Sequence, residues 1–192
     1  MRIMFKDINK LFWAFRGLRY KLIFGRFGNL SYIGKPISII GKRNIFIGNR
    51  VRIYPGIRME AANGGSITIE DNTAIAQNFH ITSDAENLII GSNSTILGNV
   101  CITNIDHDYH DIKKHVLEQK RIIRTTRIGE NCFIGFGSVI LAGSTLGNNC
   151  VVGANSVVRG NFPDYCVIVG APAKVVKRYN PVSNEWERTE RE

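Results

Sequence analysis

The chain has 192 residues, of which 44% are hydrophobic and 21% are charged, a composition typical of a soluble globular protein with a buried core. Its four cysteines form no CxxC pair and are too few for a disulfide scaffold, so they indicate a reducing compartment. The longest apolar run near the N-terminus, Leu11–Phe15, is too short for a signal peptide or a membrane span. We therefore expect a cytoplasmic protein with one main domain.

The formal net charge of +9 is concentrated at the N-terminus, where residues 1–30 hold seven Lys/Arg and a single acid, Asp7. This asymmetry favours an anionic partner, either a membrane surface or a phosphorylated substrate, and no nucleic-acid-binding motif accompanies it. The sequence leaves two roles open for the segment: contact with the inner membrane surface, or packing on the coil or on another subunit. The segment is predicted to be helical because apolar residues recur at helical spacing: Phe5, Ile8, Leu11, Phe12, Phe15, Leu18 and Leu22.

The main domain, residues 31–178, contains an internal repeat of six residues. A period of six matches neither a strand nor a helix over its whole length, and it indicates a triangular coil of about 18 residues built from three short strands. Stacked coils would bury a continuous aliphatic column. The aliphatic positions are Ile128, Ile134, Ile140, Leu146, Val152 and Val158, with earlier runs at Ile47/Ile53, Ile69/Ile75/Ile81 and Ile90/Ile96/Ile102 and fainter members at Ile33 and Ile40.

Small residues mark the corners that such a coil requires. The fifth position of each late unit is small, and Cys132 and Cys150, three units apart, should stack in adjacent coils about 4.8 Å from each other. We expect these cysteines to be small buried corner residues. Glycine follows the aliphatic residue in four of the six late units, where we expect backbone conformations that other residues resist: Gly129, Gly135, Gly147 and Gly153.

The repeat is lost over residues 103–127, which are too polar for the core column and long enough to project as a loop. This segment holds His107, His110 and His115, of which His107 stands between two acids. Function is expected where the repeat breaks. The tail, residues 179–192, is charged and lacks the repeat, so we expect a short helix or a frayed end there.

The stretch IGENCFIGFGSVILAGSTLGNNCVVGANSVV, followed by VGAPAKVVKR, resembles the hexapeptide-repeat acyltransferases, and within them the galactoside and polysaccharide O-acetyltransferases. The resemblance covers about residues 33–178. It implies an all-β fold, a left-handed parallel β-helix, with a homotrimer, active sites shared between neighbouring subunits, acetyl-CoA as the acyl donor and no metal. The tail GAPAKVV also occurs in γ-class carbonic anhydrases and non-enzymatic relatives, so the fold alone does not settle the chemistry.

The segment IDHDYHD resembles the catalytic loop of this family, which implies that His107 is the general base. Imidazole, with a reference pKa near 6.5, suits the removal of a hydroxyl proton at neutral pH. No serine or cysteine forms a nucleophile motif with His107, which favours direct attack in a ternary complex. Asp106 and Asp108 are candidates for orienting the histidine or contacting the acceptor. Asn78 resembles an acceptor-binding asparagine, although a corner asparagine that bonds its own backbone fits equally.

The resemblance also implies a path for CoA along the later coils. Backbone groups near Ala154 and Gly160 would hold the pantetheine amides, and Arg159, Lys174 and Lys177 would pair with phosphates; an exposed basic edge is the alternative. Phe136 lies on the same path but departs from the family pattern, which usually has a smaller residue there.

The expected acceptor is a sugar hydroxyl of a surface polysaccharide, supplied as a small sugar or a lipid-linked saccharide. N-acetyl transfer to an amino sugar remains open. Two further classes are a non-catalytic scaffold and a γ-class carbonic anhydrase, in which zinc would be bound by His80, His110 and His115.

Overall fold

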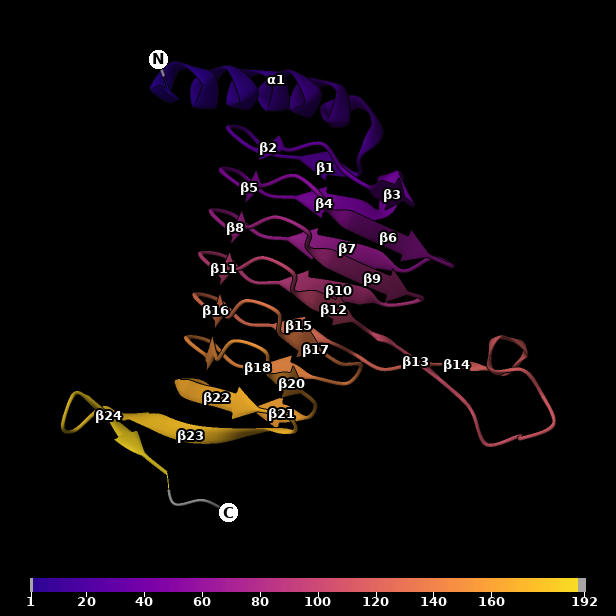
Figure 1. Ribbon diagram of the computed structural model, residues 1–192, viewed down its shortest axis with the longest axis vertical. Coiled ribbons are helices and arrows are strands. Elements are labelled where there is room, and N and C mark those ends of the chain that lie inside the picture. Colours follow the sequence, from indigo (N-terminus) through magenta and orange to yellow (C-terminus); the bar gives the residue numbers. More distant parts are fainter. Residues whose placement is uncertain (1, 190–192) are drawn as a thin grey trace.

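The computed structural model describes residues 2–189, with the side chains of the N-terminal helix described from residue 12 onward except residue 14. Phe5, Ile8 and Leu11 of the predicted apolar stripe lie outside the described side chains. The chain begins with one helix, α1 (Arg2–Ile23), and continues as the predicted left-handed parallel β-helix. The coils stack in chain order below α1, which lies across the N-terminal end of the stack (Figure 1).

Each of the first six coils contributes one strand to each of three parallel sheets, which form the three faces of the prism, and the last coil contributes one strand to the first and one to the second. The first face contains β1 (Arg26–Phe27), β4 (Ile45–Ile47), β7 (Ser66–Ile69), β10 (Asn87–Ile90), β15 (Arg127–Ile128), β18 (Thr145–Leu146) and β21 (Asn161–Phe162). The second face contains β2 (Tyr32–Ile33), β5 (Arg52–Ile53), β8 (Ala74–Ile75), β11 (Thr95–Ile96), β16 (Phe133–Ile134), β19 (Val151–Val152) and β22 (Cys166–Gly170). The third face contains β3 (Ser38–Ile40), β6 (Arg58–Ala62), β9 (His80–Asp84), β12 (Cys101–Thr103), β17 (Val139–Ile140) and β20 (Val157–Val158).

We name the edges of the prism after the faces that they join: corner 1–2, corner 2–3 and corner 3–1. A short 3-10 helix, η1 (Lys42–Asn44), occupies corner 3–1 of the first coil. The chain passes each corner once per coil, so residues that share a corner form a column parallel to the axis of the β-helix.

The predicted aliphatic column is the core of the fold. Every clear member of the six-residue pattern is buried, with at most 1% of its surface exposed. The fainter member Ile33 is buried as well, but the prediction for Ile40 is wrong: its side chain is 53% exposed because Ile40 ends β3 facing outward. Cys132 and Cys150 are buried in adjacent coils beside the paired residues Phe133 and Val151, as predicted.

The coil length of 18 residues holds only after the projecting segment. There Ile128 pairs with Leu146, 18 positions later, whereas Ile47 pairs with Ile69, 22 positions later. The additional residues lie largely on the third face, where β6 and β9 are five residues long. The third face is therefore wider in the upper coils than in the lower ones.

Asparagine is the most frequent residue in the left-handed corner conformation, ahead of glycine. Asn78 and Asn155 at corner 2–3 have φ values of 58° and 55°, a conformation that asparagine tolerates better than most residues. The observed role of glycine after the aliphatic residue differs from the predicted one, because Gly129 does not have a positive φ. A Cβ on Gly129 would lie 2.5 Å from the carbonyl of Gly147 in the next coil, so close approach of two backbones requires glycine there.

One face of α1 closes the N-terminal end of the core. The ring of Trp13 lies 5.7 Å from the rings of both Tyr32 and Tyr54, and the ring of Tyr20 lies 4.6 Å from that of Phe24. Gly17 permits the close contact between the helix and the first coil, because a Cβ there would lie 3.1 Å from the carbonyl oxygen of residue 31. Packing on the coil is thus one role of α1. Within residues 2–189, no helix has the length and hydropathy needed to cross a bilayer.

The C-terminal tail differs from its prediction. It forms an antiparallel hairpin of β23 (Ala173–Asn180) and β24 (Glu185–Arg188), which extends the second face beyond β22. The last coil leaves the edge of β22 with unpaired backbone groups, and β23 satisfies them. The ring of Tyr179 also contacts the rings of Tyr165 and Trp186 at 5.9 and 5.6 Å. The tail is therefore ordered by strand pairing at the exposed edge of β22, although it lacks the six-residue repeat.

Substitution in the core column should be far more destabilising than substitution on the surface. Ile134→Ala removes a fully buried side chain and should cost about 2–5 kcal/mol of the free energy of unfolding. Ile112→Ala is the matched control, because Ile112 is 94% exposed. Thermal and denaturant unfolding should show a clear loss for the first variant and almost none for the second; equal stabilities would contradict the assignment of the core.

Candidate functional site

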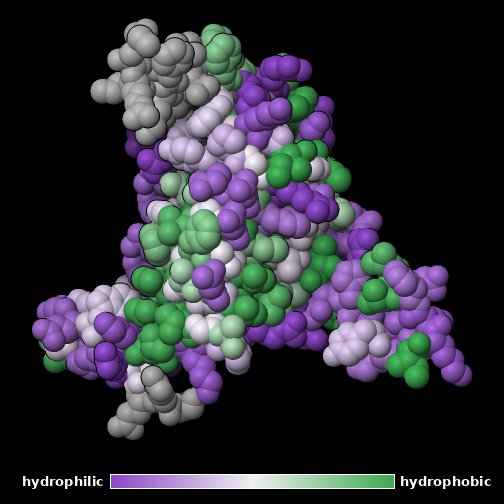
Figure 2. All heavy atoms as spheres, in the orientation of Figure 1, coloured by the Kyte–Doolittle hydropathy of each residue, from purple (hydrophilic) through white to green (hydrophobic). Residues whose placement is uncertain are grey.

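The candidate site is built on a hairpin inserted at corner 3–1 of the fourth coil. Its strands are β13 (Ile105–His107) and β14 (Arg121–Ile123), which pair antiparallel and place His107 opposite Arg121. A 3-10 helix, η2 (Val116–Glu118), lies in the segment between them. The segment projects well away from the prism (Figure 1), and its surface is mostly hydrophilic (Figure 2). The position of His107 is therefore set by a short sheet, not by an irregular loop.

A buried carboxylate anchors the base of this hairpin. The side chain of Asp84, at the end of β9, is only 4% exposed and accepts hydrogen bonds from Arg121 Nη1 at 2.7 Å and Asn63 Nδ2 at 2.9 Å. Asn104, at the start of the insertion, accepts a hydrogen bond from the backbone N–H of Asp84 and donates one to its carbonyl, both at 2.9 Å. Because Arg121 pairs with His107 across the hairpin, this network fixes the strand that supports the histidine.

His107 is half-buried, and its backbone N–H donates to Asp106 Oδ1 at 3.0 Å. The other carboxylate oxygen of Asp106 accepts a hydrogen bond from Arg159 Nη2 at 2.8 Å, which ties the hairpin to the sixth coil. Arg159 and the His107 N–H together hold the pKa of Asp106 below its ordinary value. The ion pair is therefore present at neutral pH and is lost only as the pH falls through that lowered pKa.

The ring of His107 retains an unused polar atom. Its Nδ1 is buried and has no hydrogen-bond partner among the residues that the structure describes. A buried ring nitrogen without a partner is unusual, and it is an expected feature of a group that binds a ligand or a residue of another subunit.

The other three histidines lie in different surroundings. His110 Nδ1 lies 2.6 Å from Asp108 Oδ1, so the carboxylate of Asp108 pairs with His110 and not with the ring of His107. His115 Nδ1 accepts a hydrogen bond from the backbone N–H of Leu117 and caps η2. His80 lies on the third face, where burial and Arg58 lower its pKa. Among residues 2–189, no group of three or more His, Cys, Asp or Glu is placed to hold a metal ion.

A second group of predicted site residues lies along corner 2–3. Asn78, Phe136 and Ala154 are all exposed there, in the third, fifth and sixth coils. The carbonyl of Phe136 accepts a hydrogen bond from the backbone N–H of Asn155 at 2.8 Å, which stacks the two later corners directly. Lys174 lies close to the same column, because β23 pairs it with Val169 near the end of β22. Lys177 lies further along β23, opposite Val167.

The predicted residues thus form two groups on opposite edges of the third face. Arg159 and Gly160 lie with His107 at corner 3–1, whereas Phe136 and Ala154 lie at corner 2–3. Ala154 and Arg159 are five positions apart, so up to about 16 Å of extended chain separates the two corners. A single chain does not bring His107 to the column of Phe136 and Ala154.

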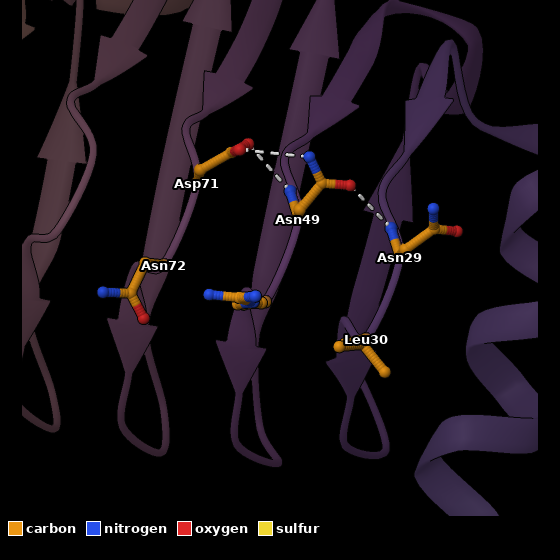
Figure 3. A pocket seen from close by; sticks show the side chains of 6 residues that line it. Asn29, Leu30, Asn49, Asp71 and Asn72 are labelled. Carbon is orange, nitrogen blue, oxygen red and sulfur yellow. Dashed lines mark hydrogen bonds between the residues drawn. The ribbon is translucent and has the colours of Figure 1, made fainter.

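One hollow in the surface lies elsewhere, at corner 1–2 of the upper coils. It has a volume of about 420 Å3 and is lined by Asn29, Leu30, Asn49, Arg50, Asp71 and Asn72. Three of its polar residues form a ladder (Figure 3): Asp71 accepts from the backbone and side-chain N–H groups of Asn49, which in turn accepts from the backbone of Asn29. This ladder satisfies corner backbone groups and lies away from the hairpin.

Comparison with known proteins decides the family. Residues 125–160 match the family model described as bacterial transferase hexapeptide (six repeats). The chain is also 33% identical over 173 residues to the putative lipopolysaccharide biosynthesis O-acetyl transferase WbbJ of Escherichia coli strain K12, covering 83% of this chain and 85% of that protein. The chain belongs to the hexapeptide-repeat acyltransferases.

This acyltransferase is also similar to a second named relative and to a solved structure. It is 34% identical over 148 residues to a polysialic acid O-acetyltransferase of Escherichia coli O1:K1 / APEC, covering 73% of this chain and 46% of that protein. Its fold matches AntD, an N-acyltransferase from Bacillus cereus solved with dTDP and coenzyme A, with a TM-score of 0.74 and 21% identity over 85% of this chain and 88% of that one. At this identity, the second match supports the fold alone.

Sequence reasoning about this acyltransferase missed three residues of the site: Asp84, Asn104 and Arg121. Their one signal is that they lie where the repeat breaks: the position six residues after Ile81 is the polar Asn87, and Asn104 and Arg121 fall within residues 103–127. Nothing in the sequence indicates that a carboxylate three residues after Ile81 would be buried or would pair with an arginine 37 positions away.

Loss of the anchoring ion pair should impair catalysis through the position of His107. We expect Arg121→Ala to lower kcat at least about tenfold, because it leaves the buried Asp84 carboxylate without its cationic partner. The KM for acetyl-CoA should change little, because Arg121 is not among the residues expected to contact CoA. Arg127→Ala, an exposed arginine on β15, is the matched control. Steady-state kinetics would contradict the anchoring role if both variants behaved alike.

Proposed function

We propose that this acyltransferase moves an acetyl group from acetyl-CoA to a sugar hydroxyl during the synthesis of a surface polysaccharide. The observation that carries the proposal is the 33% identity to an O-acetyl transfer protein of lipopolysaccharide biosynthesis over 85% of that protein's length. The partial relative named as a polysialic acid O-acetyltransferase supports the same acceptor class. Both names concern O-acetylation, which favours a hydroxyl over an amino sugar as the acceptor.

In the proposed mechanism, the ring of His107 removes the proton from the acceptor hydroxyl as its oxygen attacks the thioester carbonyl of acetyl-CoA. The carbon–sulfur bond then breaks, the acetyl group remains on the sugar oxygen, and the proton held by His107 passes to the CoA thiolate. No covalent acyl-enzyme is needed. Asp106, held by Arg159, fixes the backbone of His107 through the hydrogen bond to its N–H.

The separation of the two residue groups supports a homotrimer with sites between subunits. If CoA runs along Phe136, Ala154 and Lys174 at corner 2–3, its thiol lies across the third face from His107 of the same chain. We infer that the histidine of a neighbouring subunit completes each site and that the unpaired Nδ1 finds its partner there or in the acceptor. Arg159 and Gly160 would then contact CoA bound mainly to another subunit, while Lys177 lies further along β23.

The remaining parts of the proposal follow from this arrangement. Asn78 lies at corner 2–3, above Phe136 in the same column, where it can reach an acceptor bound beside the acetyl group. Asp108 would contact the acceptor only if it gave up its hydrogen bond to His110.

We place the protein in the cytoplasm, where acetyl-CoA is available, with a small sugar or a lipid-linked saccharide as acceptor. An acceptor screen with labelled acetyl-CoA tests this proposal. Exclusive labelling of amino sugars would contradict O-acetyl transfer and show N-acetyl transfer instead.

His107→Ala should lower turnover by about 10²–10⁴-fold because it removes the general base. Its thermal stability and its affinity for CoA should match the unsubstituted protein, because His107 lies outside the aliphatic column and the binding contacts with CoA are assigned to other residues. His110→Ala and His115→Ala are matched controls on the same segment and should retain most activity. Near-native turnover of His107→Ala would exclude this histidine as the base.

Mixed trimers should test the shared site directly. His107→Ala removes the base, and Ala154→Trp fills the exposed corner column along which CoA is expected to lie; each homogeneous variant should be nearly inactive. In a ring of three shared sites, every mixed trimer has one intact site, so co-expressed, dual-tagged mixtures should regain about one third of native activity. Mixtures that stay inactive, from subunits shown to assemble, would place both groups in a single-chain site.

A further inference from the structure

The helix α1 exposes an apolar stripe on the face turned away from the coils. The residues that pack on the first coil, Trp13, Gly17 and Tyr20, follow one another at helical spacing on a single face. At about 100° per residue, the opposite face carries four large apolar side chains within an arc of about 120°. They are Phe12, Phe15, Leu18 and Leu22, with exposed fractions of 63, 58, 58 and 77%.

A row of this kind is not the usual distribution of exposed apolar residues. Single exposed leucines are normal on a soluble protein, whereas a contiguous apolar row marks an interaction surface. These four residues do not take part in the packing of α1 on the first coil, because the face with Trp13 and Tyr20 makes those contacts. The stripe is therefore available to a partner outside the described chain.

The charge of the chain is segregated toward the same end of the molecule. Residues 1–58, which form α1 and most of the first two coils, hold 13 Lys/Arg and one acid, Asp7. Residues 59–192 hold the other 12 Lys/Arg and 15 Asp/Glu. Arg19, Lys21 and Arg26 are exposed near the stripe. A strongly cationic end thus adjoins a slightly acidic remainder.

We propose that this end of the molecule docks on the surface of an anionic lipid bilayer. The stripe would enter the boundary between headgroups and acyl chains, and the basic residues around it would pair with lipid phosphates. A second copy of the same end is a poor partner, since two strongly cationic surfaces repel each other. The proposal concerns a surface distinct from the candidate catalytic site.

Docking has a geometric consequence that rests on the proposed function. Three coil spacings of about 4.8 Å separate the first coil from the fourth, and α1 adds about 10 Å. Because α1 lies across the end of the stack (Figure 1), His107 would stand about 25 Å above the membrane surface. A hydroxyl acetylated there belongs to a lipid-linked saccharide of several units and not to the sugar attached directly to the lipid.

The test is co-sedimentation with vesicles made of three parts phosphatidylcholine and one part phosphatidylglycerol, compared with pure phosphatidylcholine. The protein should bind the anionic vesicles, bind the neutral ones at least about tenfold more weakly, and dissociate as salt is raised. Phe15→Glu/Leu22→Glu should reduce binding at least about tenfold. Arg19→Glu should also weaken it. Val182→Glu, at an 89% exposed residue of the C-terminal hairpin, and Arg188→Glu are the matched controls.

Two further measurements separate this proposal from the others. Acetyl transfer to a water-soluble sugar should be unchanged in Phe15→Glu/Leu22→Glu, so a failure of docking and a failure of the proposed activity would be distinguishable. Sedimentation velocity should give the same oligomer size for this variant and the unsubstituted protein. Absence of binding to anionic vesicles, equal binding by the variant, or loss of the native oligomer in the variant would overturn the proposal, the last by making the stripe a subunit interface.

Discussion

The buried aliphatic column is the constraint on which the rest of the structure depends. The third to sixth coils each place an isoleucine, leucine or valine inward from each face, and the stack is stable only if successive coils keep the same register. This requirement fixes the strands and leaves the chain free only at the corners and at the ends of the stack. Chemistry on such a fold must therefore use corner columns, insertions at corners or added terminal segments.

The protein has all three features. Corner 2–3 offers a column of exposed residues parallel to the axis, the insertion at corner 3–1 carries His107, and the two ends carry α1 and the β23–β24 hairpin. The inserted hairpin is the most dependent on polar contacts. Its base rests on the buried Asp84 and on Asn104, and its outer part is tied to Arg159 through Asp106. A rigid prism thus supports a histidine that does not belong to its repeat.

The parts of the fold that repeat could be predicted from the sequence, because one burial rule applies to every coil. The exceptions have local causes. Ile40 follows the spacing but faces outward at the end of β3, and the tail forms a hairpin because β22 presents an unpaired edge. The sequence singled out His107 because it lies where the repeat stops. The ion pair between Asp84 and Arg121 could not be predicted, since two residues so distant in sequence meet only once the coil is built.

The central claim is that one chain holds only part of a site, with the proposed CoA column and His107 at different corners. The most direct measurement is an experimental structure of the oligomer with CoA bound. The account predicts that the thiol lies beside Phe136 and Ala154 of one chain and within hydrogen-bonding reach of His107 of its neighbour. A thiol that instead lies beside His107 of the same chain, with no second subunit contributing, would contradict it.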